Sequence, residues 1–105
     1  MLVDIPEVKS LFAGIPAQLP EELFEALVQN PAFTLERIVS RGHRSAPGQW
    51  YDQERAEWVL VVRGGARLIF EAREEVVEMG AGDYMQIPAH CRHRVEWTEI
   101  GRAHV

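Results

Sequence analysis

The feature that most constrains this chain is a succession of short apolar runs, separated by turn-forming residues, that begins after Pro31. The candidate strands cover residues 33–41, 57–63, 66–70, 76–79 and 84–87. Short strands with turn signals between them are typical of a β-sandwich or a β-barrel. The dipeptide Gly64-Gly65 between two apolar runs predicts a tight hairpin at that point. The sequence therefore predicts an all-β domain.

The segment from residue 91 to residue 98 alternates strictly between two kinds of side chain. One set consists of Cys91, His93, Val95 and Trp97. The other set consists of Arg92, Arg94, Glu96 and Thr98. Successive side chains of a strand point to opposite faces of the sheet, so the first set is expected to be buried and the second to face water. This pattern places His93 in the protein interior.

The first third of the chain has a different pattern. Leu23, Phe24, Leu27 and Val28 lie at helical spacing, after a proline and two glutamates that suit a helix N-terminus. Asn30-Pro31 then ends the pattern. We predict a short helix over residues 21–28. The expected organisation is an N-terminal helical extension, residues 1–32, packed on a barrel formed by residues 33–105.

Length and charge limit the classes of partner. The 105 residues suit one domain. The net charge of −5 disfavours binding to a nucleic-acid backbone, and the basic cluster 92–94 is too short to change this. No apolar run is long enough to cross a bilayer, and residues 1–6 lack the features of a signal peptide. With a single cysteine the chain forms no internal disulfide. We expect a soluble cytoplasmic protein that binds neither nucleic acid nor membranes.

The chain from residue 57 to residue 97 resembles the cupin superfamily. The spacing from Glu57 across six residues to Gly64 matches the second half of cupin motif one. The spacing from Gly82 across five residues to Pro88, and then to His93, matches motif two. Three segments also resemble a group of small single-domain bacterial cupins: 50–53, 57–60 and 87–95. The resemblance implies a small antiparallel jelly-roll barrel, here with the short N-terminal helix outside it.

The chain departs from the cupin motifs at several positions. The paired histidines of motif one are missing, and their places fall either on Tyr51 and Gln53 or on Trp50 and Asp52. In motif two, His90 replaces the glycine and Trp97 replaces the terminal asparagine. After Trp97 we expect residues 103–105 to supply only a stub of a closing strand.

The resemblance implies a metal site that this sequence matches in part. In metal-binding cupins, two histidines and a glutamate of motif one and a histidine of motif two hold one divalent cation. Only Glu57 and His93 remain here, and the missing ligands of a site for Zn, Fe, Ni or Mn would have to come from His90, Gln53, Asp52 or Tyr51. The alternative is a buried hydrogen-bonded pair of Glu57 and His93 without any metal.

Two functions follow from these possibilities. In the first, the barrel holds a small ligand, and Trp50, Tyr51, Asp52 and Trp97 line its pocket. In the second, the protein is a metal-dependent enzyme of the oxygenase, isomerase or decarboxylase type that uses Glu57 and His93. The missing histidines favour the first, and the fold itself does not decide between them.

The strand over residues 57–63 also predicts self-association. If Glu57 and Val59 face inward, then Trp58, Leu60 and Val62 form an apolar row on the outer face. Such a row needs a cover, and one short helix is not expected to cover it and also protect a sheet edge. Two-fold dimers are the commonest soluble assembly, and cupins commonly pair. We therefore expect a homodimer.

Overall fold

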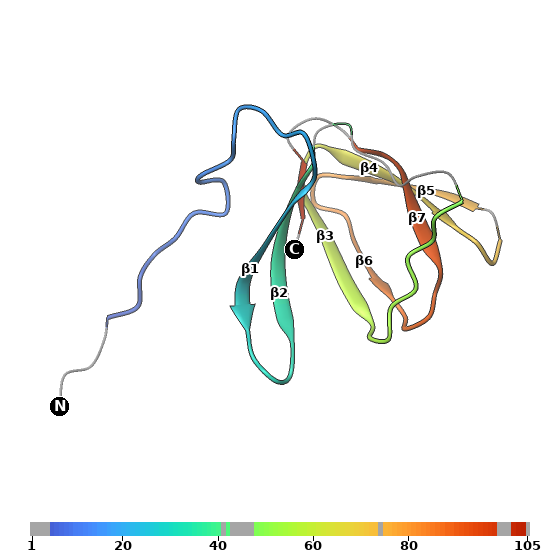
Figure 1. The fold of residues 1–105 in the computed structure, drawn as a ribbon, viewed down its shortest axis with the longest axis horizontal. Coiled ribbons are helices and arrows are strands. Elements are labelled where there is room, and N and C mark those ends of the chain that lie inside the picture. Colours follow the sequence, from blue (N-terminus) through green and yellow to red (C-terminus); the bar gives the residue numbers. More distant parts are fainter. Residues whose placement is uncertain (1–4, 41, 43–47, 74, 99–101, 105) are drawn as a thin grey trace.

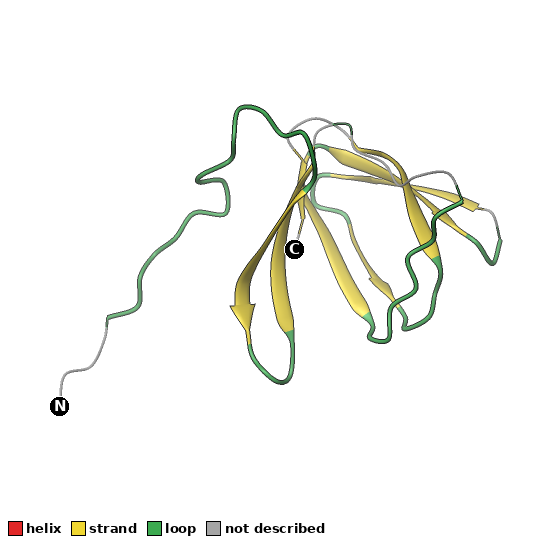
Figure 2. Ribbon diagram, in the orientation of Figure 1, coloured by secondary structure: helices red, strands yellow, loops and turns green. Residues whose placement is uncertain are grey.

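The computed structural model describes residues 5–40, 42, 48–73, 75–98 and 102–104. Within these residues the chain forms strands and loops and no helix (Figures 1 and 2). The strands are β1 (Leu23–Gln29), β2 (Thr34–Ser40), β3 (Glu57–Arg63), β4 (Gly65–Phe70), β5 (Glu75–Gly80), β6 (Tyr84–Ile87), β7 (His93–Thr98) and β8 (Arg102–His104). The prediction of an all-β fold is confirmed. No helix in the described part of the chain is long and apolar enough to span a membrane.

The strands form two antiparallel sheets. The larger sheet has the order β1-β2-β8-β3-β6, and the smaller has the order β5-β4-β7. Strand β8 lies between β2 and β3, pairing Ile38 and Val61 with His104. The C-terminal strand has three residues and is thus as short as expected, yet it joins the β1–β2 hairpin to the rest of the larger sheet.

The predicted helix over residues 21–28 is wrong, because this segment contains β1, which pairs with β2 from Leu23 to Gln29. The helical spacing of the apolar residues arises from a β-bulge between Ala26 and Val28, which disturbs simple alternation. The side-chain oxygen of Asn30 accepts hydrogen bonds from the N–H groups of Ala32 and Phe33 at 2.9 and 3.1 Å. Asn30-Pro31 therefore makes the turn of a hairpin.

The hairpin predicted at Gly64-Gly65 is also wrong. Strand β3 pairs with β6 and β8, whereas β4 pairs with β5 and β7. Gly64 has a φ of 77°, a conformation that glycine adopts without the steric cost of a side chain. The dipeptide therefore carries the chain from one sheet to the other.

The hydrophobic core lies between the two sheets. Its buried members are Val59, Val61, Leu68, Met79, Ile87 and Val95. These residues come from both sheets, and within β3 they alternate with the more exposed Trp58 and Leu60. In and just before β7 the predicted alternation holds in part: His93 and Val95 are buried and Arg92 is exposed, whereas Cys91, Arg94 and Glu96 are half-buried. The side chain of Trp97 lies outside the described residues.

The outer face of the larger sheet keeps an uncovered aromatic pair. Trp58 is 50% exposed and Tyr84 is 68% exposed, and their ring centroids lie 5.7 Å apart. No helix covers this pair in the described part of the chain. The first described residues of the chain instead lead away from the sheets (Figure 1, dark blue). The cover that the sequence assigned to a helix is therefore missing from the described part of the chain.

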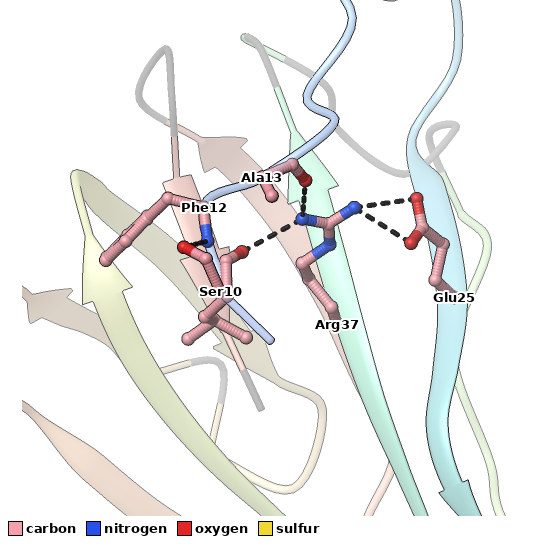
Figure 3. A network of polar contacts seen from close by, with 6 residues as sticks. Ser10, Phe12, Ala13, Glu25 and Arg37 are labelled. Carbon is pink, nitrogen blue, oxygen red and sulfur yellow. Dashed lines mark hydrogen bonds and ion pairs between the residues drawn. The ribbon is translucent and has the colours of Figure 1, made fainter. Parts of the chain in front are cut away.

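The N-terminal segment is held to the β1–β2 hairpin by Arg37, whose side chain is 5% exposed (Figure 3). One terminal nitrogen of Arg37, Nη1, donates to the carbonyl oxygens of Leu11 and Ala13 at 2.9 and 2.6 Å. The other, Nη2, donates to both carboxylate oxygens of Glu25 at 2.8 Å. Glu25 faces Arg37 directly across the two strands. This cross-strand pair therefore fixes where the N-terminal segment crosses the hairpin.

Candidate functional site

A cavity of about 80 Å³ lies between the two sheets. Its apolar wall consists of Phe24, Ile38, Val59, Val61, Ala66, Leu68, Met79, Ile87 and Val95. Its polar side chains are those of Glu22, Tyr51, Gln53, Glu57 and His93. The cavity is thus an apolar chamber with a few polar groups supplied by several separate segments.

The loop before β3 reaches the cavity by pairing with the segment that leads into β7. Tyr51 and His93 form an antiparallel β-bridge, in which each N–H donates to the other residue's carbonyl oxygen, at 2.7 and 3.2 Å. Two residues beyond Tyr51, the carbonyl oxygen of Gln53 accepts a hydrogen bond from the N–H of His90 at 2.8 Å. This pairing brings Tyr51 and Gln53 to the cavity that also receives His93.

The ring of His93 is held in one orientation. Its Nδ1 lies 2.9 Å from the carbonyl oxygen of Cys91. Because a carbonyl oxygen only accepts, Nδ1 carries the proton, and in the neutral ring Nε2 keeps its lone pair. The ring centroid lies 5.7 Å from that of Tyr51 and 5.8 Å from that of Phe70. His93 therefore presents a positioned imidazole to the cavity.

Glu57 lies at the start of β3, opposite Ile87 of β6, and lines the same cavity as His93. In the described part of the chain, no hydrogen bond joins these two side chains. The carboxylate and the imidazole are therefore separate groups on the wall of one chamber. Both remain free to contact a bound molecule.

His90 and Asp52 lie outside the cavity and contact each other. His90 Nδ1 is 2.9 Å from Asp52 Oδ1, and both side chains are largely exposed. His90 has a φ of 61°, which lies in the left-handed region that favours glycine. This residue occupies the glycine position of cupin motif two, so the backbone keeps the glycine conformation although the side chain is histidine.

Of two further predicted pocket residues, Trp50 does not line the cavity and Trp97 is not described at the side-chain level. Trp50 is half-buried, and the guanidinium carbon of Arg94 lies 5.0 Å from its ring centroid. This cation–π contact places Trp50 against the non-core side of β7. Trp97 belongs to β7 by its backbone, but its side chain lies outside the described residues. Of the predicted site residues, the structure thus brings together Tyr51, Gln53, Glu57 and His93.

Sequence reasoning missed the contribution of the β1–β2 hairpin. Glu22, Phe24 and Ile38 line the cavity, and a carboxylate oxygen of Glu22 accepts a hydrogen bond from the hydroxyl of the buried Ser40. Interpreting residues 21–28 as a helix concealed these positions. A strand interpretation would have placed Glu22 and Phe24, two residues apart, on one face of the sheet.

The cavity residues do not fit a resident divalent metal ion. The four positions of the cupin ligand set correspond to Tyr51, Gln53, Glu57 and His93, and only the last two are common ligands of a catalytic metal. His90, which could have added an imidazole, is paired with Asp52 outside the cavity wall. Among the described residues, no three His, Cys, Asp or Glu side chains are grouped so as to hold a metal. We therefore propose no reaction that uses a metal ion bound in this cavity.

Known structures and families agree with this fold. A proposed mannose-6-phosphate isomerase from Ralstonia eutropha JMP134 is 42% identical, with a TM-score of 0.86 over 94% of this chain and 92% of that one. A cupin superfamily protein from Desulfitobacterium hafniense DCB-2 is 20% identical, with a TM-score of 0.71 over 99% and 92% of the two chains. A conserved protein of unknown function from Streptococcus pyogenes is 16% identical, with a TM-score of 0.73 over 97% and 86%. No curated protein matches. The cupin domain family matches residues 38–105, so this chain belongs to the cupin family.

Proposed function

We propose that this protein binds a small organic molecule in the cavity between its sheets. The observation that supports this most strongly is the composition of the cavity wall. Aliphatic side chains form most of the wall, and Tyr51, Gln53, Glu57 and His93 add polar groups from three segments. Ligand sites in proteins typically combine an apolar wall with a few polar groups that fix orientation. One of these groups, His93, is buried and already oriented.

The volume of the cavity limits the ligand. About 80 Å³ is roughly half the volume, about 150 Å³, of an engineered cavity that holds benzene. A molecule of a few non-hydrogen atoms, or one short branch of a larger molecule, suits this space. A compact branched alkyl group with one polar end matches both the volume and the wall.

A second candidate function is proton transfer in an isomerase. Glu57 and His93 are side chains of the kinds that act as general base and general acid, and they line one cavity. The similarity to a protein named as a proposed mannose-6-phosphate isomerase supports this candidate. Incubation with mannose 6-phosphate, followed by NMR for the ketose product, tests it directly. Product formed by the natural chain and lost in His93→Ala would favour catalysis over binding alone.

The binding proposal is tested with methionine methyl groups as reporters. Met79 lines the cavity, whereas Met85 packs on the core without lining it. In protein carrying ¹³C-methyl methionine, isobutanol is expected to shift the Met79 signal in a saturable manner and to leave Met85 nearly unchanged. In Ala66→Val, which adds two methyl groups to the wall, the Met79 shift is expected to disappear. Equal responses of the two methyl groups would contradict the proposal.

We also propose that the chain forms a homodimer. Trp58 and Tyr84 leave an aromatic surface exposed on the larger sheet. Ile5 and Val8 are 89% and 98% exposed, on an N-terminal segment that leads away from the sheets (Figure 1). A second copy would bury both kinds of apolar surface, because a two-fold pair offers each copy's N-terminal segment to the other's sheet.

A further inference from the structure

We infer that the ligand of the cavity carries a hydrogen-bond donor, as a small alcohol does, and that His93 selects it over molecules that only accept hydrogen bonds, such as ketones and ethers. This inference rests on the proposed small-molecule function and adds the chemical class of the ligand's polar end. It depends on one feature of the wall, a buried imidazole nitrogen that is fixed as an acceptor and has no partner among the described residues.

The orientation of the His93 ring is fixed by its neighbours. Its Nδ1 lies 2.9 Å from the carbonyl oxygen of Cys91, and the N–H of Cys91 donates to the carbonyl oxygen of Pro88 at 3.2 Å, so a hydrogen-bonded turn holds the acceptor in place. The rings of Tyr51 and Phe70 lie beside the imidazole, with centroids 5.7 and 5.8 Å away. Rotating the ring by half a turn would break the bond to Cys91 and put a C–H group at its carbonyl oxygen. The proton therefore stays on Nδ1, and Nε2 of the neutral ring is an acceptor.

Nε2 is the nitrogen of His93 that is accessible to a ligand. His93 lines the cavity and is 5% exposed. Among the described residues, the one fully enclosed side-chain polar atom without a hydrogen-bond partner is Nε of Arg37. Nε2 of His93 also makes no hydrogen bond within these residues, so it is not fully enclosed. It therefore borders space that a small molecule can enter, and the space that His93 lines is the cavity.

Tyr51 and Gln53 do not impose the same choice on a ligand. The phenol hydroxyl both donates and accepts hydrogen bonds, and the amide of Gln53 has a carbonyl oxygen as well as an NH₂ group. Both side chains line the cavity, and neither is held by a hydrogen bond within the described residues. They can therefore adapt to a donor or to an acceptor. The nitrogen that cannot adapt is Nε2 of His93, so it decides the class of the ligand's polar end.

A ligand without a donor would leave this nitrogen unpaired. A molecule that enters the cavity has to replace the hydrogen bond that water gives to Nε2. The hydroxyl of an alcohol does so, whereas the oxygen of a ketone only accepts and would face the lone pair of the nitrogen. An unpaired acceptor in a mostly apolar chamber loses its solvation without compensation. The aliphatic wall contacts the alkyl parts of an alcohol and of the matching ketone alike, so their difference in affinity isolates the hydrogen bond to His93.

The test compares isopropanol with acetone, which share one carbon skeleton. Both are titrated into the intact protein at a pH at which imidazole is neutral, and the Met79 methyl signal reports occupancy. Isopropanol is expected to bind about tenfold more tightly than acetone, which corresponds to about 1.4 kcal/mol. In protein labelled with ¹⁵N-histidine, isopropanol is also expected to move the Nε2 signal of His93 toward the position of a protonated nitrogen. Acetone is expected to leave that signal in place.

Variants assign the preference to the imidazole. His93→Phe keeps an aromatic ring between Tyr51 and Phe70 and removes both ring nitrogens, so it is expected to bind isopropanol and acetone equally. Glu57→Gln is expected to keep the preference, because it leaves the imidazole in place. His90→Asn is the control, since it removes an imidazole that is paired with Asp52 outside the cavity wall, and asparagine tolerates the left-handed backbone at this position.

The outcomes separate this inference from the proposed function. Equal binding of isopropanol and acetone to the natural protein, or tighter binding of acetone, would overturn the donor class and leave a small-molecule cavity. Absence of any Met79 response to both probes and to isobutanol would overturn both. A preference that survives in His93→Phe would show that another group selects the alcohol, and would overturn the inference. If His93→Phe does not fold, the ¹⁵N signal decides: an unchanged Nε2 signal at saturating isopropanol would overturn it.

Discussion

Tyr51 and His93 pair as an antiparallel bridge that joins the loop before β3 to the first residue of β7. Both side chains line the cavity, and their ring centroids are 5.7 Å apart. Both backbone hydrogen bonds of the bridge are made, so the bridge fixes how the backbones of the two residues lie relative to each other. The bridge therefore couples the fold of the loop to the shape of the ligand site.

Replacing His93 with alanine tests how far the buried ring supports the structure. His93 is 5% exposed and lies between the rings of Tyr51 and Phe70. Its loss should lower the free energy of unfolding by about 3 kcal/mol, as for other large buried side chains. Arg94→Ala is the matched control, since Arg94 contacts Trp50 and should cost no more than about 1 kcal/mol. Denaturant unfolding measures both, and equal costs would contradict the assigned faces of β7.

Arg37 should be the most important polar residue for holding the N-terminal segment. Arg37→Ala removes hydrogen bonds to Glu25 and to the carbonyl oxygens of Leu11 and Ala13. We expect a loss of about 3 kcal/mol in unfolding free energy, together with faster proteolysis within residues 5–22. Arg67→Ala removes an exposed ion pair and should cost about 0.5 kcal/mol or less. Unchanged proteolysis in Arg37→Ala would contradict the anchoring role.

His90 adopts a backbone conformation that suits glycine better than any residue with a Cβ atom. Its φ is 61°, and its ring is paired with Asp52 on the surface. Alanine and glycine both remove this pair, but only glycine relieves the backbone. We therefore expect His90→Gly to be more stable than His90→Ala by about 1 kcal/mol in denaturant unfolding. If alanine were equal to glycine, the residue would not be held in the left-handed region.

The homodimer is tested by the mass in solution. Light scattering at micromolar concentration should give about twice the 12.0 kDa of one chain. The double variant Ile5→Asp, Val8→Asp should lower the mass, because it places charges on the exposed apolar positions of the N-terminal segment. Glu7→Gln in the same segment is the control and should leave the dimer intact. A mass near 12.0 kDa for the natural chain would contradict the assembly.

The parts of the fold that could be predicted depend on a strict two-residue period. The alternation in β3 correctly places Val59 and Val61 in the core and Trp58 outside, and the alternation in β7 correctly buries His93. These residues lie on strands that bury one face against the core, so that a shift of one residue would expose the core side chains. In β3 and β7 the two-residue period was sufficient to predict which side chains are buried, because burial and strand pairing favour the same register.

The parts that could not be predicted depend on contacts between distant segments. The four apolar residues of β1 match a helix, and only pairing with β2 and the Glu25–Arg37 contact make this segment a strand. Gly64-Gly65 is compatible with a hairpin or with a corner between sheets, and the partners of β3 and β4 decide between them. Glu22 reaches the cavity through the same unforeseen strand, so its place on the cavity wall could not be predicted from the sequence.

A crystal structure of the protein with isobutanol tests the central claim most directly. The account predicts electron density for the probe inside the cavity, with its alkyl group against the aliphatic side chains of the wall. Crystals of Ala66→Val grown in the same solution should lack that density, because the added methyl groups occupy part of the wall. Density for the probe only on the outer surface, or an unchanged cavity at saturating concentration, would contradict the claim that this cavity is the ligand site.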